Sequence, residues 1–300
     1  MSSFIIASRG SKLALWQAHF TAERLPGSAE VRIYKTQGDQ IQHLSLSKVE
    51  GKGFFTKEIE EALLSQQANV AVHSLKDLPT EEHPDLEIVA VPKRYPATDL
   101  LLINRSAYDS DVVLGLPQKA RVGTSSIRRK AQLLATRPDL ELVDIRGNVP
   151  TRAGRVGNDL DAVILARAGV ERLELMESEA YVTKELSFDE MLPAPGQGAL
   201  GIQMRRNDPD SAKVRAQLHC EITAKCVAIE RGLLSLAGGG CHLPLGALAV
   251  WENGQFNVRA RVTSPQGSAV MESRFSGTDA NQIIEALWSD LARQGAENYL

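Results

Sequence analysis

Three things are scarce in this sequence: aromatic side chains, cysteine and net charge. Phe, Trp and Tyr make up only 5% of the 300 residues, so Leu, Val, Ile and Ala must fill most of the core. The formal net charge is -3, which argues against a general binder of nucleic acid or another polyanion. A function that involves anions would therefore need a local patch of positive charge. With 43% hydrophobic and 24% charged residues, the chain has the composition of an ordinary globular protein.

Long apolar runs and export features are also missing. No run approaches the roughly 18 apolar residues that span a bilayer, so we expect no membrane segment. Residues 1–9 lack a basic stretch followed by a long apolar one, so we expect no secretory signal. The three cysteines are an odd number, which is typical of reduced thiols rather than of paired disulfides. We therefore expect a cytoplasmic protein.

Motifs for metals and nucleotides are absent as well. Cys220 and Cys226 lie on one predicted helix but face different directions, and no Cys-x-x-Cys or His-x3-His spacing occurs. Neither a Gly-x4-Gly-Lys-Ser/Thr loop nor a Gly-x-Gly-x-x-Gly turn after a strand is present. We therefore expect no metal site, and a nucleotide is disfavoured as ligand.

Short apolar runs alternate with helical patterns over the first two thirds of the chain. The expected strands are residues 4–8, 31–36, 70–73 and 86–91 and, after Asp99, residues 100–103, 121–123, 140–144 and 162–165. Apolar residues at helical spacing are clearest at 11–25 and 54–64. This order predicts an α/β fold with mainly parallel sheets.

Two proline-containing joints, at residues 92–96 and 193–196, flank the second block of strands. They predict a domain inserted into another, with residues 199–204 returning to the first; one large sheet with incidental prolines is the alternative. One long helix from Asp208 to Gly238, then alternating segments and a last helix at 281–293, indicate a small α+β domain. The predicted limits are residues 1–93 with 194–210 for domain 1, 94–193 for domain 2 and 211–300 for domain 3.

Positive charge is concentrated between residues 121 and 172, where nine Arg and one Lys face six acids. Arginine presents a planar fork that holds a carboxylate or phosphate through two parallel hydrogen bonds. Arg137 and Arg155 fit a solvated helix surface. The arginines that stand beside turn residues at predicted strand ends are Arg128, Arg129, Arg146 and Arg152. We expect this second group to bind an anion.

Two turns repeat one arrangement of polar residues. Gly123–Ser126 follows a strand and opens a helix, and Ser8–Ser11 does the same in the first block. A helix start offers free backbone N–H groups and a favourable dipole, which together favour an anion. The alternative is that these hydroxyls only cap helices. Because each turn has an arginine close by, the pair favours an anionic ligand held between two lobes.

Reactive side chains follow another predicted strand and the glycine-rich end of the long helix. Asp77, in the segment His73–Asp77, stands after a short strand, where α/β proteins place functional groups. It is a candidate for proton transfer or for stabilising a cation, or else a surface partner of Lys76; His73 receives no role. Cys241 follows Gly238–Gly240, which either end a helix or leave the thiol accessible for covalent attachment.

Seven segments, taken in order, match one known family. They are Ser8–Ser11 with Leu13–Ala18, Gly51–Glu58, Ala71–Asp77, Gly123–Arg129, Arg146–Arg152, Pro195–Gly198 and Gly239–Cys241. Any one of them would be weak evidence, but the ordered set is highly specific. The chain resembles the porphobilinogen deaminases (hydroxymethylbilane synthases) over essentially its whole length.

The resemblance implies two α/β domains folded like periplasmic binding proteins, an active-site cleft between them, and a small third domain. It implies a dipyrromethane cofactor attached to Cys241 through a thioether. Four molecules of the substrate porphobilinogen are deaminated and added in turn to this primer, and hydrolysis releases hydroxymethylbilane for tetrapyrrole (heme) biosynthesis. Each pyrrole carries an acetate and a propionate, which accounts for the arginines. We expect a monomer with no nucleic-acid or membrane partner.

The family pattern also implies roles for individual residues. The residues implied to be catalytic are Arg9, Lys76, Asp77, Arg146 and Arg152. Those implied to bind the cofactor are Ser74, Lys76, Asp77, Thr124, Ser125, Ser126, Arg128, Arg129, Gly147 and Cys241. Those implied to bind substrate are Arg9, Ser11, Phe55, Arg146, Arg152, Arg172 and Gln197. Asp77 matches the acid near the pyrrole nitrogens, Phe55 matches a ring over the cofactor, and Lys48 and Lys52 lie in or beside the family's mobile loop.

The sequence departs from the family pattern at two places. The hinge motif Arg-Glu-Asp-Pro-Arg-Asp reads Lys93-Arg94-Tyr95-Pro96-Ala97-Thr98-Asp99 here, and Glu50 stands where glycine is common. These changes leave the details of domain closure and loop motion open. Two non-enzyme alternatives are an anion receptor, which would need neither the accessible cysteine nor Asp77, and a nucleic-acid binder, which would need aromatic stacking side chains.

Overall fold

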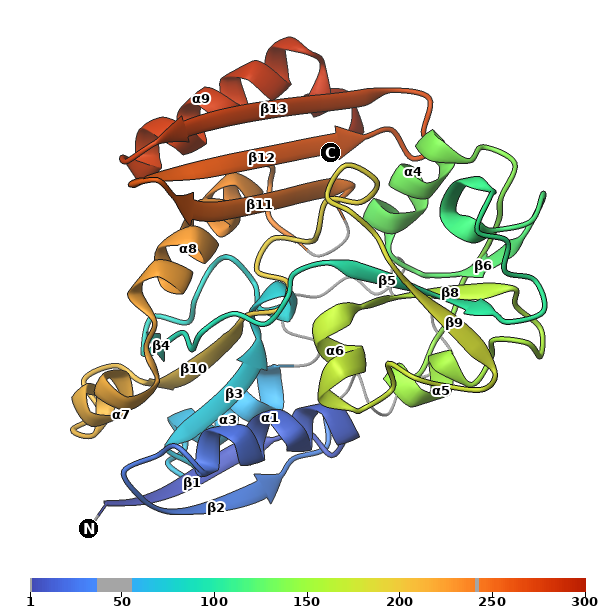
Figure 1. Cartoon of the computed structure of the whole chain (residues 1–300). Helices are drawn as coiled ribbons and strands as arrows, with labels where there is room; N and C mark the ends of the chain where they lie inside the picture. The colour runs from blue at the N-terminus through green and yellow to red at the C-terminus, as the bar shows by residue number, and fades with distance from the viewer. Residues whose placement is uncertain (1, 37–55, 241–242) are drawn as a thin grey trace. The chain divides into compact units, whose positions relative to one another are not determined.

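The computed structural model describes residues 2–36, 56–240 and 243–300 (Figure 1). Predictions for Lys48, Glu50, Lys52, Phe55 and Cys241 fall outside these residues. The chain divides into two compact units, each made of two segments. The first unit is Met1–Tyr95 with Gly198–Lys225, and the second is Pro96–Gln197 with Cys226–Leu300. The three domain limits and the cleft stay predictions.

The first unit contains a five-stranded sheet in the order β2-β1-β3-β10-β4. Its strands are β1 (Ser2–Ser8), β2 (Gly27–Ile33), β3 (Val70–Ser74), β4 (Leu86–Ala90) and β10 (Leu200–Arg205). Its helices are α1 (Lys12–Ala22), α3 (Lys57–Leu64), η2 (Leu75–Asp77) and α7 (Ser211–Leu218). β1 is parallel to β2 and β3, whereas β10 is antiparallel to β3 and β4.

Both faces of this sheet are covered, because successive side chains of a strand point to opposite sides. Phe4 belongs to a buried cluster that includes Ala18 of α1. Ala71 belongs to a second cluster, with Ile59 and Leu63 of α3. Two-sided burial explains why the strands read as unbroken apolar runs. Because β1 and β3 are parallel, their carboxyl ends lie at one edge of the sheet.

The second unit contains another five-stranded sheet, in the order β7-β6-β8-β5-β9. Its strands are β5 (Asp99–Asn104), β6 (Arg121–Gly123), β7 (Glu141–Val143), β8 (Ala162–Ala166) and β9 (Tyr181–Glu185). Its helices are η3 (Val113–Gly115), α4 (Ile127–Thr136), α5 (Val149–Ala153) and α6 (Arg167–Arg172). β6 is parallel to β7 and β8, and β5 is antiparallel to β8 and β9.

The two sheets therefore have the same design. In each sheet, three parallel strands are followed by one antiparallel strand and then by an edge strand. The edge strands, β4 and β9, both precede a proline-containing joint in the chain. The chain leaves the first sheet after β4, forms the whole second sheet, and returns as β10. The returning strand predicted at residues 199–204 is confirmed as β10, and the alternative of one large sheet is wrong.

The C-terminal part forms a third, antiparallel sheet of β11 (Leu245–Glu252), β12 (Gln255–Thr263) and β13 (Val270–Gly277), drawn side by side in Figure 1. Its helices are α8 (Glu221–Leu236), α9 (Ala280–Arg293) and η4 (Ala296–Tyr299). Apolar residues of α8 and α9, such as Leu233 and Leu287, share one buried cluster with the sheet. The predicted class, α/β with a small α+β part, is confirmed.

One predicted helix is wrong. The segment from Asp208 to Gly238 forms two helices, α7 and α8, instead of one. The break comes at His219, which has extended backbone angles. There Val91, just after β4, accepts a hydrogen bond from the Cys220 amide (2.8 Å) and donates one to His219 Nδ1 (3.2 Å). Pairing with the end of β4 replaces a helical turn, and Cys220 precedes α8 instead of sharing a helix with Cys226.

No helix within residues 2–36, 56–240 and 243–300 is long and apolar enough to cross a membrane. Over the same residues, no group of three or more His, Cys, Asp or Glu side chains is placed to hold a metal ion.

Candidate active site

The turn from β1 to α1 is built by its hydroxyls. Ser11 caps α1, and its Oγ accepts a hydrogen bond from the Ala14 amide at 3.3 Å. Ser8 Oγ donates to the Ala14 carbonyl at 3.2 Å. The capping role anticipated for these serines is therefore real, and it fixes the backbone around Arg9 at the start of the helix.

A small cavity of about 90 Å³ lies at the carboxyl ends of β1 and β3. Its lining residues are Ser8, Arg9, Ser11, Leu13, Ala14, Gln17, Thr56, Ile59, Val72, His73, Ser74 and Asp77. The structure thus brings together four of the predicted site residues, Arg9, Ser11, Ser74 and Asp77. Two helix starts, those of α1 and α3, contribute to the same wall, which favours negative charge in a ligand.

Asp77 ends η2 and is exposed, and it has no hydrogen-bond or ion-pair partner in the part of the chain that the structure describes. The surface pair with Lys76, considered from the sequence, is therefore not formed. Lys76 itself is half-buried. Ser74 Oγ accepts a hydrogen bond from Gln17 Nε2 at 2.9 Å, so this hydroxyl is held by α1. An exposed carboxylate at a strand end is available to a ligand.

His73 lies beside these residues in a buried position. Its Nε2 bonds Gln203 Oε1 at 3.0 Å, and Gln203 Nε2 donates in turn to Glu60 at 3.2 Å. A carboxylate only accepts hydrogen bonds, so Gln203 presents its oxygen to His73, and His73 Nε2 carries the proton. Burial lowers the pKa of His73 to about 4, so the ring is neutral at pH 7.

The turn from β6 to α4 repeats the arrangement of the first unit. Ser126 caps α4 and accepts from the Arg129 amide at 3.4 Å. Ser125 Oγ donates to the Ile145 carbonyl at 2.6 Å and accepts from the Ile145 amide at 3.0 Å. Thr124 Oγ1 accepts from the Ser126 amide at 3.3 Å. A Cβ atom on Gly123 would stand 2.6 Å from Leu160 Cδ1 and 2.9 Å from Ile145 Cγ2, so a larger residue would displace these side chains where β6 meets its neighbours.

Arg128 and Arg129 follow this turn, and both are buried, with 4% and 6% of their surface exposed. Their guanidinium groups share one carboxylate. Arg128 Nη2 donates to Asp99 Oδ2 at 2.9 Å, and Arg129 Nη2 donates to Asp99 Oδ1 at 2.7 Å. Each also donates through Nη1 to a carbonyl, of Leu192 (2.5 Å) and of Ile164 (3.1 Å). Neither Nε has a partner among the described residues.

Gln197 completes this cluster. It is fully buried, and its amide nitrogen donates to the Ala97 carbonyl at 2.7 Å and to Asp99 Oδ1 at 2.8 Å. In this structure the amide nitrogen is therefore directed at the Ala97 carbonyl and at Asp99. Burial lowers the pKa of the Arg128 guanidinium, whereas the charge of Asp99 acts in the opposite direction.

The other predicted residues of the second unit lie near the start of α5 and in α6. Asn148 caps α5, and Arg152 Nε donates to the Gly147 carbonyl at 2.7 Å. Gly147 has φ +102°, a conformation that favours glycine. Arg146 is half-buried, and Arg172 is buried in α6.

The surface position expected for Arg137 is wrong: it pairs with Asp139 and donates to three carbonyls. Arg155, expected on a solvated surface, is partly exposed and pairs with Asp159.

Two buried acids were missed by the sequence analysis. Asp99 is fully buried, and so is Glu230 of α8, which accepts hydrogen bonds from the amides of Gly196 (2.7 Å) and Ala249 (2.8 Å). Adjacent arginines after a strand were a signal for Asp99, because buried cations need a counter-ion. For Glu230 the signal was an acid at a helical position next to the apolar Ile229.

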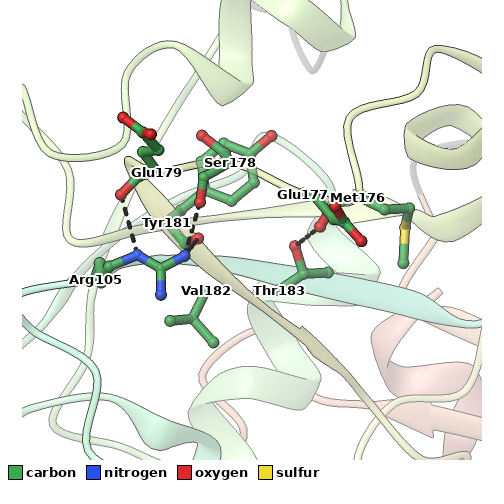
Figure 2. Close-up of a pocket in the computed structure, with 8 residues that line it drawn as sticks. All are labelled: Arg105, Met176, Glu177, Ser178, Glu179, Tyr181, Val182 and Thr183. Carbon is green, nitrogen blue, oxygen red and sulfur yellow. Dashed lines mark hydrogen bonds between the residues drawn. The ribbon is translucent and has the colours of Figure 1, made fainter.

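A larger hollow of about 590 Å³ lies elsewhere in the second unit, against β9 (Figure 2). As Figure 2 shows, Arg105 turns its guanidinium toward the chain there, donating to the carbonyls of Ser178 (2.7 Å), Glu179 (3.0 Å) and Tyr181 (3.0 Å). Arg105 thus fastens the segment before β9. None of the predicted site residues lines this hollow.

These features define an α/β protein whose two sheets each present a polar turn, one beside an exposed carboxylate and the other beside buried paired arginines. Residues 4–213 match the family model described as porphobilinogen deaminase, dipyromethane cofactor binding domain. Residues 224–292 match the porphobilinogen deaminase C-terminal domain. The chain therefore belongs to the porphobilinogen deaminase family.

Curated relatives agree over the full length. The porphobilinogen deaminase of Maridesulfovibrio salexigens is 43% identical, covering 100% of this chain and 98% of the relative. That of Thiobacillus denitrificans is 41% identical, with 100% and 98% covered. Among solved structures, an ancestral cationic amino acid solute binding protein aligns with a TM-score of 0.43 and 12% identity over 72% of this chain and 87% of that one. That likeness is too distant to support a conclusion.

Proposed function

We propose that Asp77 is the acid–base group of this enzyme and that Arg128 and Arg129 bind carboxylates of its cofactor. The enzyme deaminates porphobilinogen and joins four of these units to a covalently bound dipyrromethane primer, releasing hydroxymethylbilane for tetrapyrrole biosynthesis. The observation that carries the assignment is the contrast between the two polar turns. An unpartnered, exposed carboxylate follows β3, and two buried cations that share one carboxylate follow β6.

The side chains of the second unit fit a dipyrromethane group. Each of its pyrroles carries an acetate and a propionate, so the group needs cations. Arg128 and Arg129 bring two positive charges to one negative charge, that of Asp99. The cofactor supplies the pyrrole carbon that attacks the deaminated substrate. The backbone amide of Ser125 and the arginines would hold its carboxylates, since the amides of Thr124 and Ser126 and the three hydroxyls already serve the turn.

Asp77 is suited to the step in which ammonia leaves porphobilinogen. Breaking the C–N bond leaves an electron-poor methylene group whose positive charge is shared with the ring N–H. A carboxylate beside that N–H stabilises the transition state more than the ground state, because the charge appears only as the bond breaks. Asp77 would also carry the proton that the leaving amine needs and later accept one from the coupled ring.

The remaining predicted residues are assigned to binding. Arg9 and Ser11 line the cavity that Asp77 also lines, so we assign them to a carboxylate of the incoming substrate. Lys76 and Ser74 come from the same strand end. Arg146, Gly147, Arg152 and Arg172 are assigned to the growing chain, and Gln197 to the support of Asp99. Phe55 keeps the role that the resemblance implies.

Cys241 is proposed as the attachment point of the cofactor. The mass of the denatured protein tests this, because a thioether survives denaturation. Wild type should be heavier than its sequence by two linked pyrrole units. Cys241→Ser should lose that mass and the activity, whereas Cys220→Ser and Cys226→Ser keep both. A fully active wild type without added mass would refute the assignment.

We also propose that the protein acts in the cytoplasm as a monomer. Cys220 is a free thiol, which supports a reducing compartment. Light scattering on the purified enzyme measures the oligomeric state, and a mass twice that of the chain would contradict the proposal.

A further inference from the structure

We infer that Asp99 is a positioning residue, a built-in counter-ion that holds Arg128 and Arg129 in place and leaves one positive charge of the pair for a ligand carboxylate. This inference rests on the proposed function of the two arginines. It concerns a residue to which the sequence analysis gave no role.

The geometry divides one carboxylate between two cations. Each oxygen of Asp99 accepts from a different arginine, Oδ2 from Arg128 at 2.9 Å and Oδ1 from Arg129 at 2.7 Å. Each guanidinium is also held on its other terminal nitrogen by a backbone carbonyl. Hydrogen bonds at both terminal nitrogens, together with the covalent link at Nε, fix a guanidinium in place, so Asp99 helps to set the orientation of both groups.

Asp99 is itself rigidly placed. It is fully buried at the start of β5, where it pairs with Ala166 of β8, and its carbonyl accepts from the Leu186 amide at 3.0 Å. Gln197 Nε2 donates to Oδ1 at 2.8 Å and thereby limits rotation of the carboxylate. Asp99 is thus held by strand pairing on one side and by Gln197, which follows the second joint, on the other.

The charge of the cluster is incomplete. Two buried cations face one buried anion, and the Nε–H groups of both arginines have no partner among the described residues. A purely structural ion pair would be balanced, because unpaired buried charge and unsatisfied buried donors are costly. Both Nε atoms are shielded from water, so they are not the first contact of a ligand. The net positive charge of Arg128, Arg129 and Asp99 attracts a carboxylate before any new hydrogen bond forms.

Loss of the counter-ion should therefore change how the protein responds to anions. Asp99→Asn keeps the shape of the side chain but raises the net charge of the cluster formed by residue 99, Arg128 and Arg129 from one positive charge to two. We expect occupancy by the dipyrromethane group, measured by denaturing mass spectrometry, to fall at least about ten-fold. In sodium chloride, the thermal midpoint of Asp99→Asn should lie below that of wild type. Replacing the chloride by sodium sulfate at matched ionic strength should raise the midpoint of the variant more than that of wild type.

Asp139→Asn is the matched control. Asp139 also pairs with an arginine of the same unit, Arg137, but near the surface. It should keep the occupancy and the sulfate response of wild type. If Asp99→Asn behaves in the same way as this control, Asp99 is not a positioning residue. If wild type itself carries no added mass, the proposed function fails instead, so the two failures are distinguishable.

A second variant covers the case in which Asp99→Asn does not fold. Asp99→Asn combined with Arg129→Gln restores the excess of one positive charge. If this double variant folds while Asp99→Asn alone does not, the counter-ion role is supported, and occupancy should stay low because one guanidinium is missing. If neither variant folds, Asp99 is needed for its hydrogen bonds alone, and the inference is overturned.

Discussion

The turn after β1 and the turn after β6 occupy equivalent places in the two sheets, but different charged groups surround them. Both strands stand second in their sheet, and both turns end in a serine that accepts from the amide three residues on. In the first unit the nearby charged cluster is Arg9, in the turn, with Asp77, exposed at the end of the next strand. In the second it is a pair of buried arginines held by Asp99. The same backbone thus supports two kinds of chemistry.

The difference teaches how burial separates the two tasks. An exposed carboxylate stays hydrated and within reach of a substrate. Buried guanidiniums stay charged at any accessible pH and act as fixed positive charge. Proton transfer is therefore expected from Asp77, in the cavity beside the first turn, and binding of anionic groups from the arginines beside the second.

The largest effect is expected at Asp77. Asp77→Asn removes the charge but leaves the fold intact, because Asp77 has no partner within the described chain. Single-turnover ammonia release by folded, cofactor-loaded protein should slow roughly 10²–10⁴-fold. Asp77→Glu moves the charge by one methylene and should keep partial activity, with a loss of roughly 100-fold. Asp85→Asn, an exposed acid of the same unit, should behave as wild type; a wild-type rate for Asp77→Asn would remove Asp77 from the mechanism.

Replacement of Arg129 by lysine should have the next largest effect. Lysine keeps the charge but cannot reproduce the fork that joins Asp99 to the Ile164 carbonyl. The free energy of unfolding should fall by about 2 kcal/mol, and cofactor occupancy should fall as well. Urea unfolding and denatured mass measure the two quantities. Arg137→Lys should also destabilise the protein but leave occupancy unchanged, and equal occupancy in both variants would count against a role in binding.

His73 should make the stability of the enzyme depend on pH. Its pKa is about 4 in the folded protein and 6.5 in the unfolded chain, so the unfolded chain binds the proton more readily between these values. Stability should therefore fall as the pH is lowered, by about 2 kcal/mol between pH 7 and pH 5. His73→Gln should flatten this part of the profile, and His83→Gln, at an exposed histidine, should not. An unchanged profile for His73→Gln would contradict the burial of a neutral ring.

The smallest effects test the equivalence of the two turns. Ser11→Ala and Ser126→Ala each remove one cap and should each cost about 1 kcal/mol of unfolding free energy. Urea unfolding of the two variants side by side measures this. If Ser11→Ala changes the Michaelis constant for porphobilinogen without changing stability, its hydroxyl serves the substrate rather than the helix.

Local patterns made much of this fold predictable. The strand at residues 199–204, the capped turns and the alternation of strands and helices depend on neighbouring residues, which a sequence displays directly. Asp99 and Glu230 were missed because their partners are distant: Asp99 and Arg128 are 29 residues apart, and Glu230 and Gly196 are 34 apart. The break at His219 was missed for the same reason, since Val91 causes it.

The insertion of the second sheet into the chain that forms the first also sets an order of assembly. All strands of the second sheet lie between residues 99 and 185, so that sheet is complete once this stretch has left the ribosome. The first sheet lacks its fourth strand until residues 200–205 follow, and until then β3 presents an unpaired edge. Gln203, the partner of His73, arrives on that last strand. The inserted sheet therefore closes first during synthesis, and the acid-bearing sheet that surrounds it in the sequence closes last.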